Sequence, residues 1–246
     1  MSWRKGILII VAGLVVSGDM VGCERMPGKP TEQERWAPPT AVMKFDVLFT
    51  KHCAGCHGEN GRLGPARPLN DPLYLALVTD DVLRAAIANG TRDASMPAFS
   101  QQAGGSLTDA QIAVLVTQMR ARWAHPNQFA NVALPPYSAQ EALAQGSGPG
   151  DPRHGRIVYK IYCSHCHDAD GGGKTGGESI IDPIYLALVS DQTLRTTVIV
   201  GRADLHKPDW RANIKNQPMS PQDISDVVAW LASHRQSEAM SSQGLH

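Results

Sequence analysis

Cys53-Ala54-Gly55-Cys56-His57 is the stretch that decides the fold of this 246-residue chain. The same C-x-x-C-H spacing returns 110 positions later, as Cys163-Ser164-His165-Cys166-His167. Residues 71–80 match residues 182–191 at an offset of 111, so one residue is inserted between the motif and this second match. Two diverged copies of one domain are the simplest explanation.

Each copy predicts a helix that runs into its C-x-x-C-H motif. In the first copy we expect Met43, Val47 and Phe49 to form the apolar side of that helix, and the segment 155–162 has the same character in the second copy. Asp71 and Asp182, each followed by Pro, predict the start of the next helix.

A longer helix closes each copy. Thr108 and Ser220 predict the two helix starts. Apolar residues follow at the spacing i, i+3, i+4, i+7, and they are Ile112, Leu115, Val116 and Met119 in the first copy and Ile224, Val227, Val228 and Leu231 in the second. Because no alternating strand pattern appears, the predicted fold class is all-α.

The C-x-x-C-H motif is typical of covalent attachment of c-type haem. Two thiols bond to the porphyrin, and the adjacent His supplies a nitrogen to the iron. This predicts two haem c groups per chain, attached through Cys53, Cys56, Cys163 and Cys166, with His57 and His167 as iron ligands. The competing interpretations are one zinc ion shared by the four cysteines, or redox-active dithiols. A shared zinc leaves both histidines unexplained.

The chain resembles class I cytochrome c, as a tandem dihaem protein. Besides the two motifs, Gly64-Pro65, Met96-Pro97 and the closing-helix residues Ala229-Trp230-Leu231 carry the resemblance. It implies two cytochrome c-like domains, each of a few helices around a covalently bound haem. It also implies Met96 as the sixth ligand of the first iron, and the Pro65 carbonyl as the acceptor of the His57 proton.

The second copy departs from this pattern. In register, Lys207 stands where Met96 stands in the first copy, and no Gly-Pro follows the motif, so the partner of His167 is not identified. A Lys ligand must lose a proton from a pKa of about 10.4. Met219 is our preferred sixth ligand; Lys207, His206 and an open or water-bound iron are the alternatives.

The N-terminus predicts export. Arg4 and Lys5 precede an apolar run over residues 6–16 that is too short to span a bilayer. Met20-Val21-Gly22-Cys23 resembles a bacterial lipobox, which implies a signal peptide over residues 1–22 and lipidation of Cys23. An uncleaved anchor and ordinary cleavage are the alternatives, and all three place the chain outside the cytoplasmic membrane.

The remaining boundaries follow from composition. We predict a tether over residues 23–39, cytochrome c domains over 40–124 and 150–236, a linker over 125–149, and a disordered tail over 237–246. Lys plus Arg equals Asp plus Glu at 23 each, so no net charge favours nucleic acid.

These features predict a bacterial, lipid-anchored dihaem cytochrome at the outer face of the cytoplasmic membrane or in the periplasm. It would carry single electrons between redox protein partners, either freely or as a subunit of a membrane respiratory complex. The alternative is a dihaem redox enzyme, a peroxidase or sulfur-compound oxidoreductase, with the second haem as substrate site. His206 and Asp204 are its only nearby acid-base candidates.

Overall fold

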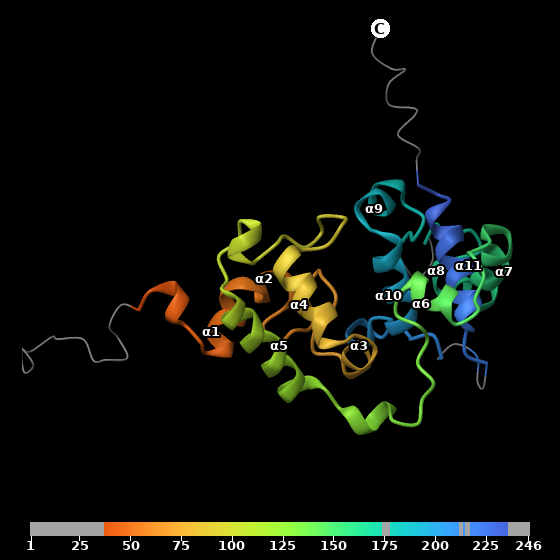
Figure 1. The fold of residues 1–246 in the computed structure, drawn as a ribbon. Coiled ribbons are helices and arrows are strands. Elements are labelled where there is room, and N and C mark those ends of the chain that lie inside the picture. The colour runs from red at the N-terminus through yellow and green to blue at the C-terminus, as the bar shows by residue number, and fades with distance from the viewer. Residues whose placement is uncertain (1–36, 174–177, 212–213, 215–216, 236–246) are drawn as a thin grey trace, which may run out of the picture. The chain divides into compact units, whose positions relative to one another are not determined.

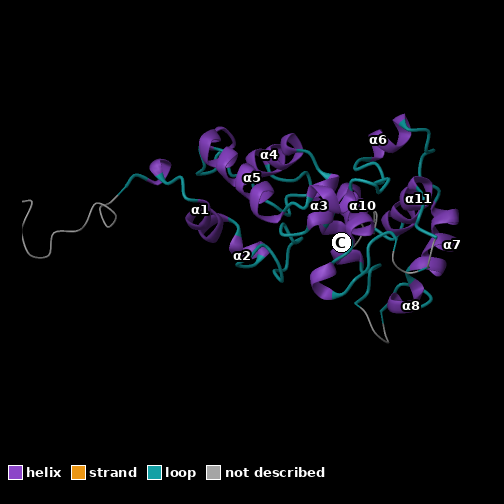
Figure 2. Ribbon diagram, turned by 90° about the horizontal axis from the view of Figure 1, so that it is seen from below, coloured by secondary structure: helices purple, strands orange, loops and turns teal. Residues whose placement is uncertain are grey.

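A computed structural model of the chain describes residues 37–173, 178–211, 214 and 217–235. The predicted signal peptide, Cys23, most of the predicted tether and the tail lie outside these residues. Every named element of the described residues is a helix, and only isolated bridges supply β-pairing there (Figure 2). The all-α prediction is therefore confirmed.

The first repeat is built from five α-helices, seen from orange to green in Figure 1. These helices and the short 3-10 turns beside them are α1 (Phe45–His52), α2 (Ala54–His57), α3 (Pro72–Leu77), α4 (Asp80–Asn89), α5 (Asp109–Trp123), η2 (Pro39–Ala41), η3 (Gln101–Ala103) and η4 (Pro126–Phe129).

The second repeat follows the same order after one additional short helix. Its elements are α6 (Ala139–Ala144), α7 (Pro152–Tyr162), α8 (Ser164–His167), α9 (Pro183–Leu188), α10 (Asp191–Val200), η5 (Ala203–Leu205) and α11 (Pro221–Ala232). The two repeats belong to one unit of the chain, from Pro39 onward. Within the described ranges, no helix has both the length and the apolar character that a membrane crossing needs.

Side-chain caps begin the helices where the sequence predicts them. Asp71 accepts hydrogen bonds from the backbone N–H groups of Leu73 and Tyr74, at 2.8 and 3.0 Å, and Asp182 accepts from Tyr185 at 2.8 Å. Both closing helices begin with a capping box, at Thr108 and at Ser220. These bonds satisfy backbone donors that the first helical turn leaves free.

The closing helices bury the predicted stripes. All eight residues of the two i, i+3, i+4, i+7 patterns are buried in α5 and α11. Each stripe faces the core of its own repeat, so each closing helix covers one side of that core.

The apolar face of α1 agrees with the prediction at Phe49 and differs from it at Met43 and Val47. Met43 lies before the helix begins and Val47 is on its outer side, and both remain almost half exposed, at 45% and 47%. The buried face consists of Phe45, Leu48 and Phe49. The two phenylalanine rings pack against the Trp123 ring of α5, with centroids 5.6 and 5.2 Å apart. Aromatic packing therefore fixes the rotation of α1.

In the second repeat, α7 crosses α11 at a glycine. A Cβ added to Gly155 would lie 2.0 Å from the carbonyl oxygen of Asp226, so only glycine allows this approach. One turn later, the Tyr159 ring stacks on the Trp230 ring with centroids 4.2 Å apart. The helix that leads into the second motif is thus held directly against the closing helix.

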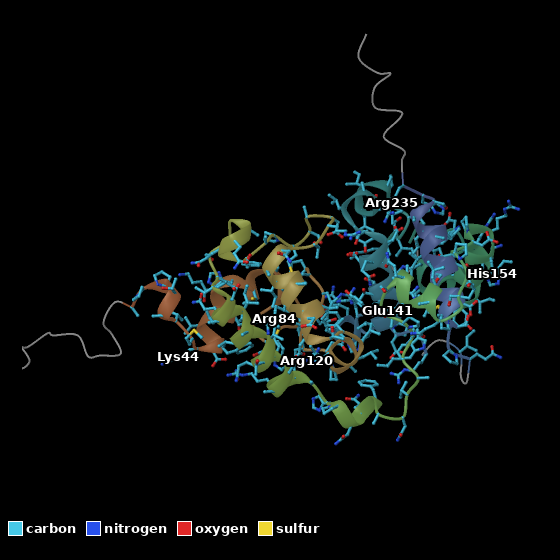
Figure 3. All side chains as sticks on the ribbon, viewed as in Figure 1. Lys44, Arg84, Arg120, Glu141, His154 and Arg235 are labelled. Carbon is cyan, nitrogen blue, oxygen red and sulfur yellow. The ribbon has the colours of Figure 1, made fainter. Side chains whose placement is uncertain are left out.

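Two arginines hold corresponding helix ends in the two repeats (Figure 3). Arg120 of α5 donates to the carbonyls of Leu75 and Val78 and to the carboxylate of Asp80. Arg235, which follows α11, donates to the equivalent groups, the carbonyls of Leu186 and Val189 and the carboxylate of Asp191. Each arginine satisfies carbonyls that a short helix leaves free at its C-terminus.

The segment predicted as a linker, 125–149, contains η4 and α6. The carbonyl of Pro136 accepts two hydrogen bonds from the buried Arg195 of α10, at 3.2 and 2.9 Å, and Ala142 of α6 is buried. Part of this segment therefore packs on the second repeat.

Candidate functional site

One cavity of about 2230 Å³ is lined by both C-x-x-C-H motifs. Ligand pockets usually measure roughly 300–1,000 Å³, so this cavity has room for more than one large ligand. Its walls are largely apolar, and they include Leu83, Ile87 and Leu115 from the first repeat and Leu194, Val227 and Leu231 from the second.

Each motif lies on one tight helical turn. The carbonyl of Cys53 accepts from the N–H groups of Cys56 and His57, at 3.2 and 2.9 Å, and the carbonyl of Cys163 accepts from those of Cys166 and His167, both at 3.1 Å. This turn puts both thiols and the imidazole of a motif on the same side of the chain. None of the four motif cysteines forms a disulfide, so all four are available for attachment.

The first cysteine of each motif is partly buried. Burial, with a smaller contribution from the second cysteine of each motif, raises the pKa of Cys53 and of Cys163 to about 12. Across the residues that the structure describes, no three His, Cys, Asp or Glu side chains converge on a metal-sized site. The four thiols therefore do not gather into the one cluster that a shared zinc requires.

The ring of His57 is held by a backbone carbonyl. Its Nδ1 donates to the carbonyl oxygen of Arg67 at 2.6 Å, whereas the resemblance had implied Pro65. The difference arises from the loop, because Gly61 turns with φ of +70° and its carbonyl accepts from Leu69, which brings residue 67 beneath the ring. The bond places the proton on Nδ1 and leaves Nε2 unprotonated, as an iron ligand requires.

Burial lowers the pKa of His57, although its hydrogen bond to Arg67 acts in the opposite direction. The neutral imidazole is therefore the favoured form in the cavity.

The second motif has the same arrangement with a different residue. His167 Nδ1 donates to the carbonyl oxygen of Glu178 at 3.1 Å, which is the partner that the sequence did not identify. Ile180 bonds to Gly171 as Leu69 bonds to Gly61, so the two loops close in the same way and Glu178 corresponds to Arg67.

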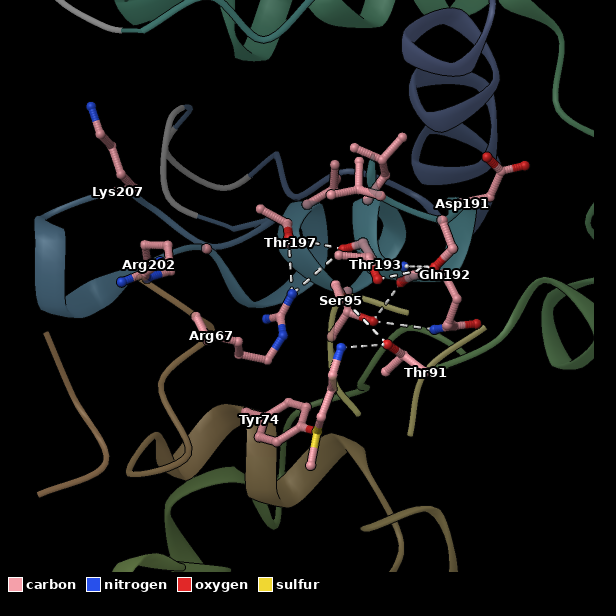
Figure 4. Close-up of a pocket in the computed structure, with 18 of the residues that line it drawn as sticks. Arg67, Tyr74, Thr91, Ser95, Asp191, Gln192, Thr193, Thr197, Arg202 and Lys207 are labelled. Carbon is pink, nitrogen blue, oxygen red and sulfur yellow. Dashed lines mark hydrogen bonds between the residues drawn. The ribbon is translucent and has the colours of Figure 1, made fainter. Parts of the chain in front are cut away.

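The candidate sixth ligands lie in different places. Met96 lines the cavity, and its backbone N–H donates to the Thr91 hydroxyl at 3.0 Å. Met219 is buried, lines the cavity and donates its N–H to the Trp210 carbonyl at 3.0 Å. Lys207 also lines the cavity, but its side chain points away from the cluster around Arg67 (Figure 4).

His206, in contrast, is exposed, has a left-handed backbone with φ of 57°, and is not among the residues that line the cavity.

The carboxylate of Asp204, one of the two acid-base candidates, already has hydrogen-bond partners. Its carboxylate pairs with Arg202, at 3.0 Å, and also accepts from the N–H of Leu63 in the first repeat, at 3.0 Å. The hydrogen bond from Arg202 is the main cause that lowers the pKa of Asp204. A buried, ionised carboxylate that already accepts hydrogen bonds from two residues is poorly suited to proton transfer.

Polar contacts between the repeats surround the cavity, and the sequence did not reveal them. Asp93 of the first repeat accepts from the N–H of Ser190 and the hydroxyl of Thr193, at 2.8 and 2.9 Å. Arg202 of the second repeat donates to the Gly64 carbonyl at 3.1 Å. The sequence placed Gly64 in the loop after the first motif, but it gave no sign that this loop contacts the second repeat.

The residues present fit a c-type haem in each repeat. Each repeat supplies two thiols on one turn, an imidazole with Nε2 unprotonated and apolar walls. Besides these groups, Nη1 of Arg67 is buried and has no hydrogen-bond partner within the described part of the chain. Such a donor fits the carboxylates that a haem carries at its edge.

Comparison with known proteins matches the same two regions. The sequence profile of the family described as cytochrome c oxidase, cbb3-type, subunit III, matches residues 40–117 and again residues 150–231. Two curated proteins of Rhodobacter capsulatus, both described as cbb3-type cytochrome c oxidase subunit CcoP, are 31% and 30% identical over 83 residues.

Each of these CcoP matches covers 31% of this chain and 28% of the relative, so the chain spans little more than a quarter of the curated proteins that it matches. Among solved structures, the Kuenenia stuttgartiensis reducing HAO-like protein complex Kustc0457/Kustc0458 aligns with 82% of this chain and 100% of its own, at a TM-score of 0.42 and 17% identity.

Proposed function

Because the chain belongs to the cbb3-type cytochrome c oxidase subunit III family, with two matched cytochrome c regions, we propose that it is a dihaem cytochrome that carries single electrons between respiratory partners. Haem iron supplies the one-electron chemistry, Fe(III) plus one electron giving Fe(II). The protein supplies attachment, axial ligands and the polarity of the surroundings.

The observation that carries this proposal is the single cavity lined by both motifs. Two haems that share one interior would lie on a common path, which suits the passage of an electron from one repeat to the other. Cys53, Cys56, Cys163 and Cys166 hold the two groups, and His57 and His167 ligate their irons.

Met96 and Met219 are our proposed sixth ligands, and both line the cavity. Met219 is favoured over Lys207 because a thioether binds iron without losing a proton, whereas an ammonium group must first be deprotonated. The exposure of His206 removes the support for the third candidate.

We further propose that the chain is exported and anchored through a lipidated Cys23 at the outer face of the cytoplasmic membrane. Its partner is then a membrane respiratory complex, which agrees with relatives described as oxidase subunits. Confinement to the membrane surface raises the effective concentration near such a partner.

Haem counting and spectroscopy test the electron-transfer proposal. Mass spectrometry of the mature protein should find two covalently attached haems, and reductive titration should take up two electrons per chain. Carbon monoxide should leave the reduced spectrum unchanged, because both irons are already six-coordinate. Fewer than two haems, or rapid carbon monoxide binding at one of them, would contradict the proposal.

The same measurement addresses the dihaem-enzyme alternative, which requires an open position on the second iron. The ion pair of Asp204 and the exposure of His206 away from the cavity weaken both acid-base candidates that the sequence offered for that alternative.

Fractionation tests the anchor. Wild-type protein should sediment with membranes, and a Cys23→Ser variant should be found in the soluble periplasmic fraction or retained as an uncleaved precursor. Soluble wild-type protein would contradict the anchor and leave the electron-transfer proposal intact.

A further inference from the structure

The guanidinium of Arg67 joins the two repeats inside the cavity. Its Nη2 donates to the Thr197 hydroxyl at 2.9 Å and approaches the Thr193 carbonyl at 3.5 Å, both on α10 of the second repeat. The Tyr74 ring of α3 lies 5.5 Å from the guanidinium carbon on the other side (Figure 4). Arg67 therefore lies between α3 and α10.

This side chain is incompletely paired. Nη1 is buried without a partner, and none of the described carboxylates hydrogen-bonds to the guanidinium. Burial lowers the pKa of Arg67, since the charged form loses its hydration. A buried guanidinium nitrogen without a hydrogen-bond acceptor is energetically unfavourable. A bound anionic group would supply the missing acceptor.

The backbone of the same residue holds His57, and Glu178 has the corresponding role for His167. The two repeats thus carry opposite charges at one equivalent position. Arg67 lines the cavity as a cation, and Glu178, also at the cavity, is exposed.

We propose that Nη1 of Arg67 binds a carboxylate of the haem attached to Cys53 and Cys56, and that Arg67 and Glu178 set the two haems at different reduction potentials. A cation near iron favours the less positive Fe(II) state, and an anion favours Fe(III). The first haem then has the higher potential, and electrons collect there. This inference rests on the proposed dihaem function.

Spectroelectrochemical titration of the full-length, haem-loaded protein tests it with paired variants. Arg67→Gln should lower one of the two potentials by about 59 mV, which is a tenfold change in the ratio of oxidised to reduced haem. Glu178→Gln should raise the other potential, by less, because solvent screens an exposed charge. Arg67→Lys should retain most of the wild-type potential, since it keeps the charge.

Arg84→Gln is the matched control, because Arg84 is an exposed cation on α4 away from the cavity. It should change neither potential measurably. The inference is overturned if Arg67→Gln has no larger effect than Arg84→Gln, or if the Arg67 and Glu178 variants shift the same haem.

A crystal structure of the haem-loaded protein provides a second measurement. Nη1 of Arg67 should lie about 2.7–2.9 Å from a haem carboxylate oxygen. A protein acceptor or water in that place would contradict the assignment. Failure of the dihaem proposal can be told apart from failure of this inference. Fewer than two haems per chain would overturn both the dihaem proposal and the inference. Two haems with unchanged potentials in Arg67→Gln would overturn only the inference.

Discussion

Asp93 and Asp204 occupy the same position in the two repeats, and each hydrogen-bonds to the other repeat. Asp93 accepts from Ser190 and Thr193 at the start of α10, and Asp204 accepts from Leu63 in the loop after the first motif. The surfaces that they contact are not equivalent, so the duplicated residue acquired two different partners. Both contacts use the carboxylate as an acceptor, which makes the contact between the repeats sensitive to acid.

Asp93→Asn should reduce stability in a pH-dependent manner. Burial raises the pKa of Asp93, but hydrogen bonds from Thr91, Ser95 and Ser190 together lower it well below 3.8. A folded-state pKa below the unfolded value stabilises the protein above pH 3.8, and this contribution is lost as the pH falls. At pH 7 we expect the variant to lose about 1–2 kcal/mol of unfolding free energy.

Denaturant unfolding of wild type and variant between pH 7 and pH 2 measures this, and the two free energies should converge toward the acid end. Glu59→Gln is the control, since Glu59 is exposed and makes no hydrogen bond within the described ranges. A difference that is constant across the pH range would show that ionisation of Asp93 is not the cause.

Gly155→Ala should destabilise the second repeat, because its Cβ would meet the Asp226 carbonyl at 2.0 Å and separate α7 from α11. Overpacking of this kind costs about 1–3 kcal/mol. Gly55→Ala is the matched control, since an added Cβ there has nothing within 4 Å. Urea unfolding followed by circular dichroism should give a lower midpoint for Gly155→Ala alone, and equal midpoints would show that the helix crossing can relax.

Met219→Ala should remove a far-red charge-transfer band between sulfur and iron from the second haem, and Met96→Ala should remove the corresponding band from the first. The physical reason is that each band requires a Met ligand on Fe(III). Lys207→Ala should leave both bands unchanged. Absorption spectra of the oxidised protein and its variants measure these bands. If Lys207→Ala alters the spectrum while Met219→Ala does not, then Lys207 is the ligand.

Arg120→Ala and Arg235→Ala should each lower the unfolding free energy by about 1.5–3 kcal/mol, because each arginine donates charged hydrogen bonds to two carbonyls and a carboxylate. Arg84→Ala, which removes an exposed cation from α4, should change it by less than about 0.5 kcal/mol. Thermal unfolding of the three variants compares them directly. Equal stabilities for all three would mean that water replaces these bonds without loss.

The features that sequence alone predicted depend on residues close together along the chain. The two motifs, the caps at Asp71 and Thr108 and the stripes of the closing helices all follow from spacings of a few residues, so they needed no tertiary information. Of the three residues expected on the buried side of α1, only Phe49 is buried, because Trp123, more than seventy residues away, decides which side packs inward.

The surroundings of the two histidines were less predictable for a related reason. The acceptor of the His57 proton depends on the path of the loop through Gly61, which places Arg67 rather than Pro65 beneath the ring. The contacts of Arg67 and Asp93 with α10 arise only when the two repeats pack together, and no local pattern encodes them.

The shared cavity has a consequence for biosynthesis. Because both motifs line one interior, a chain that received only one of its two haems would enclose a partly empty space and lose apolar contacts in both halves. Such a chain should open more often and be degraded sooner by proteases. Completion of both attachments would then act as a checkpoint, and the mature population would consist of fully loaded molecules.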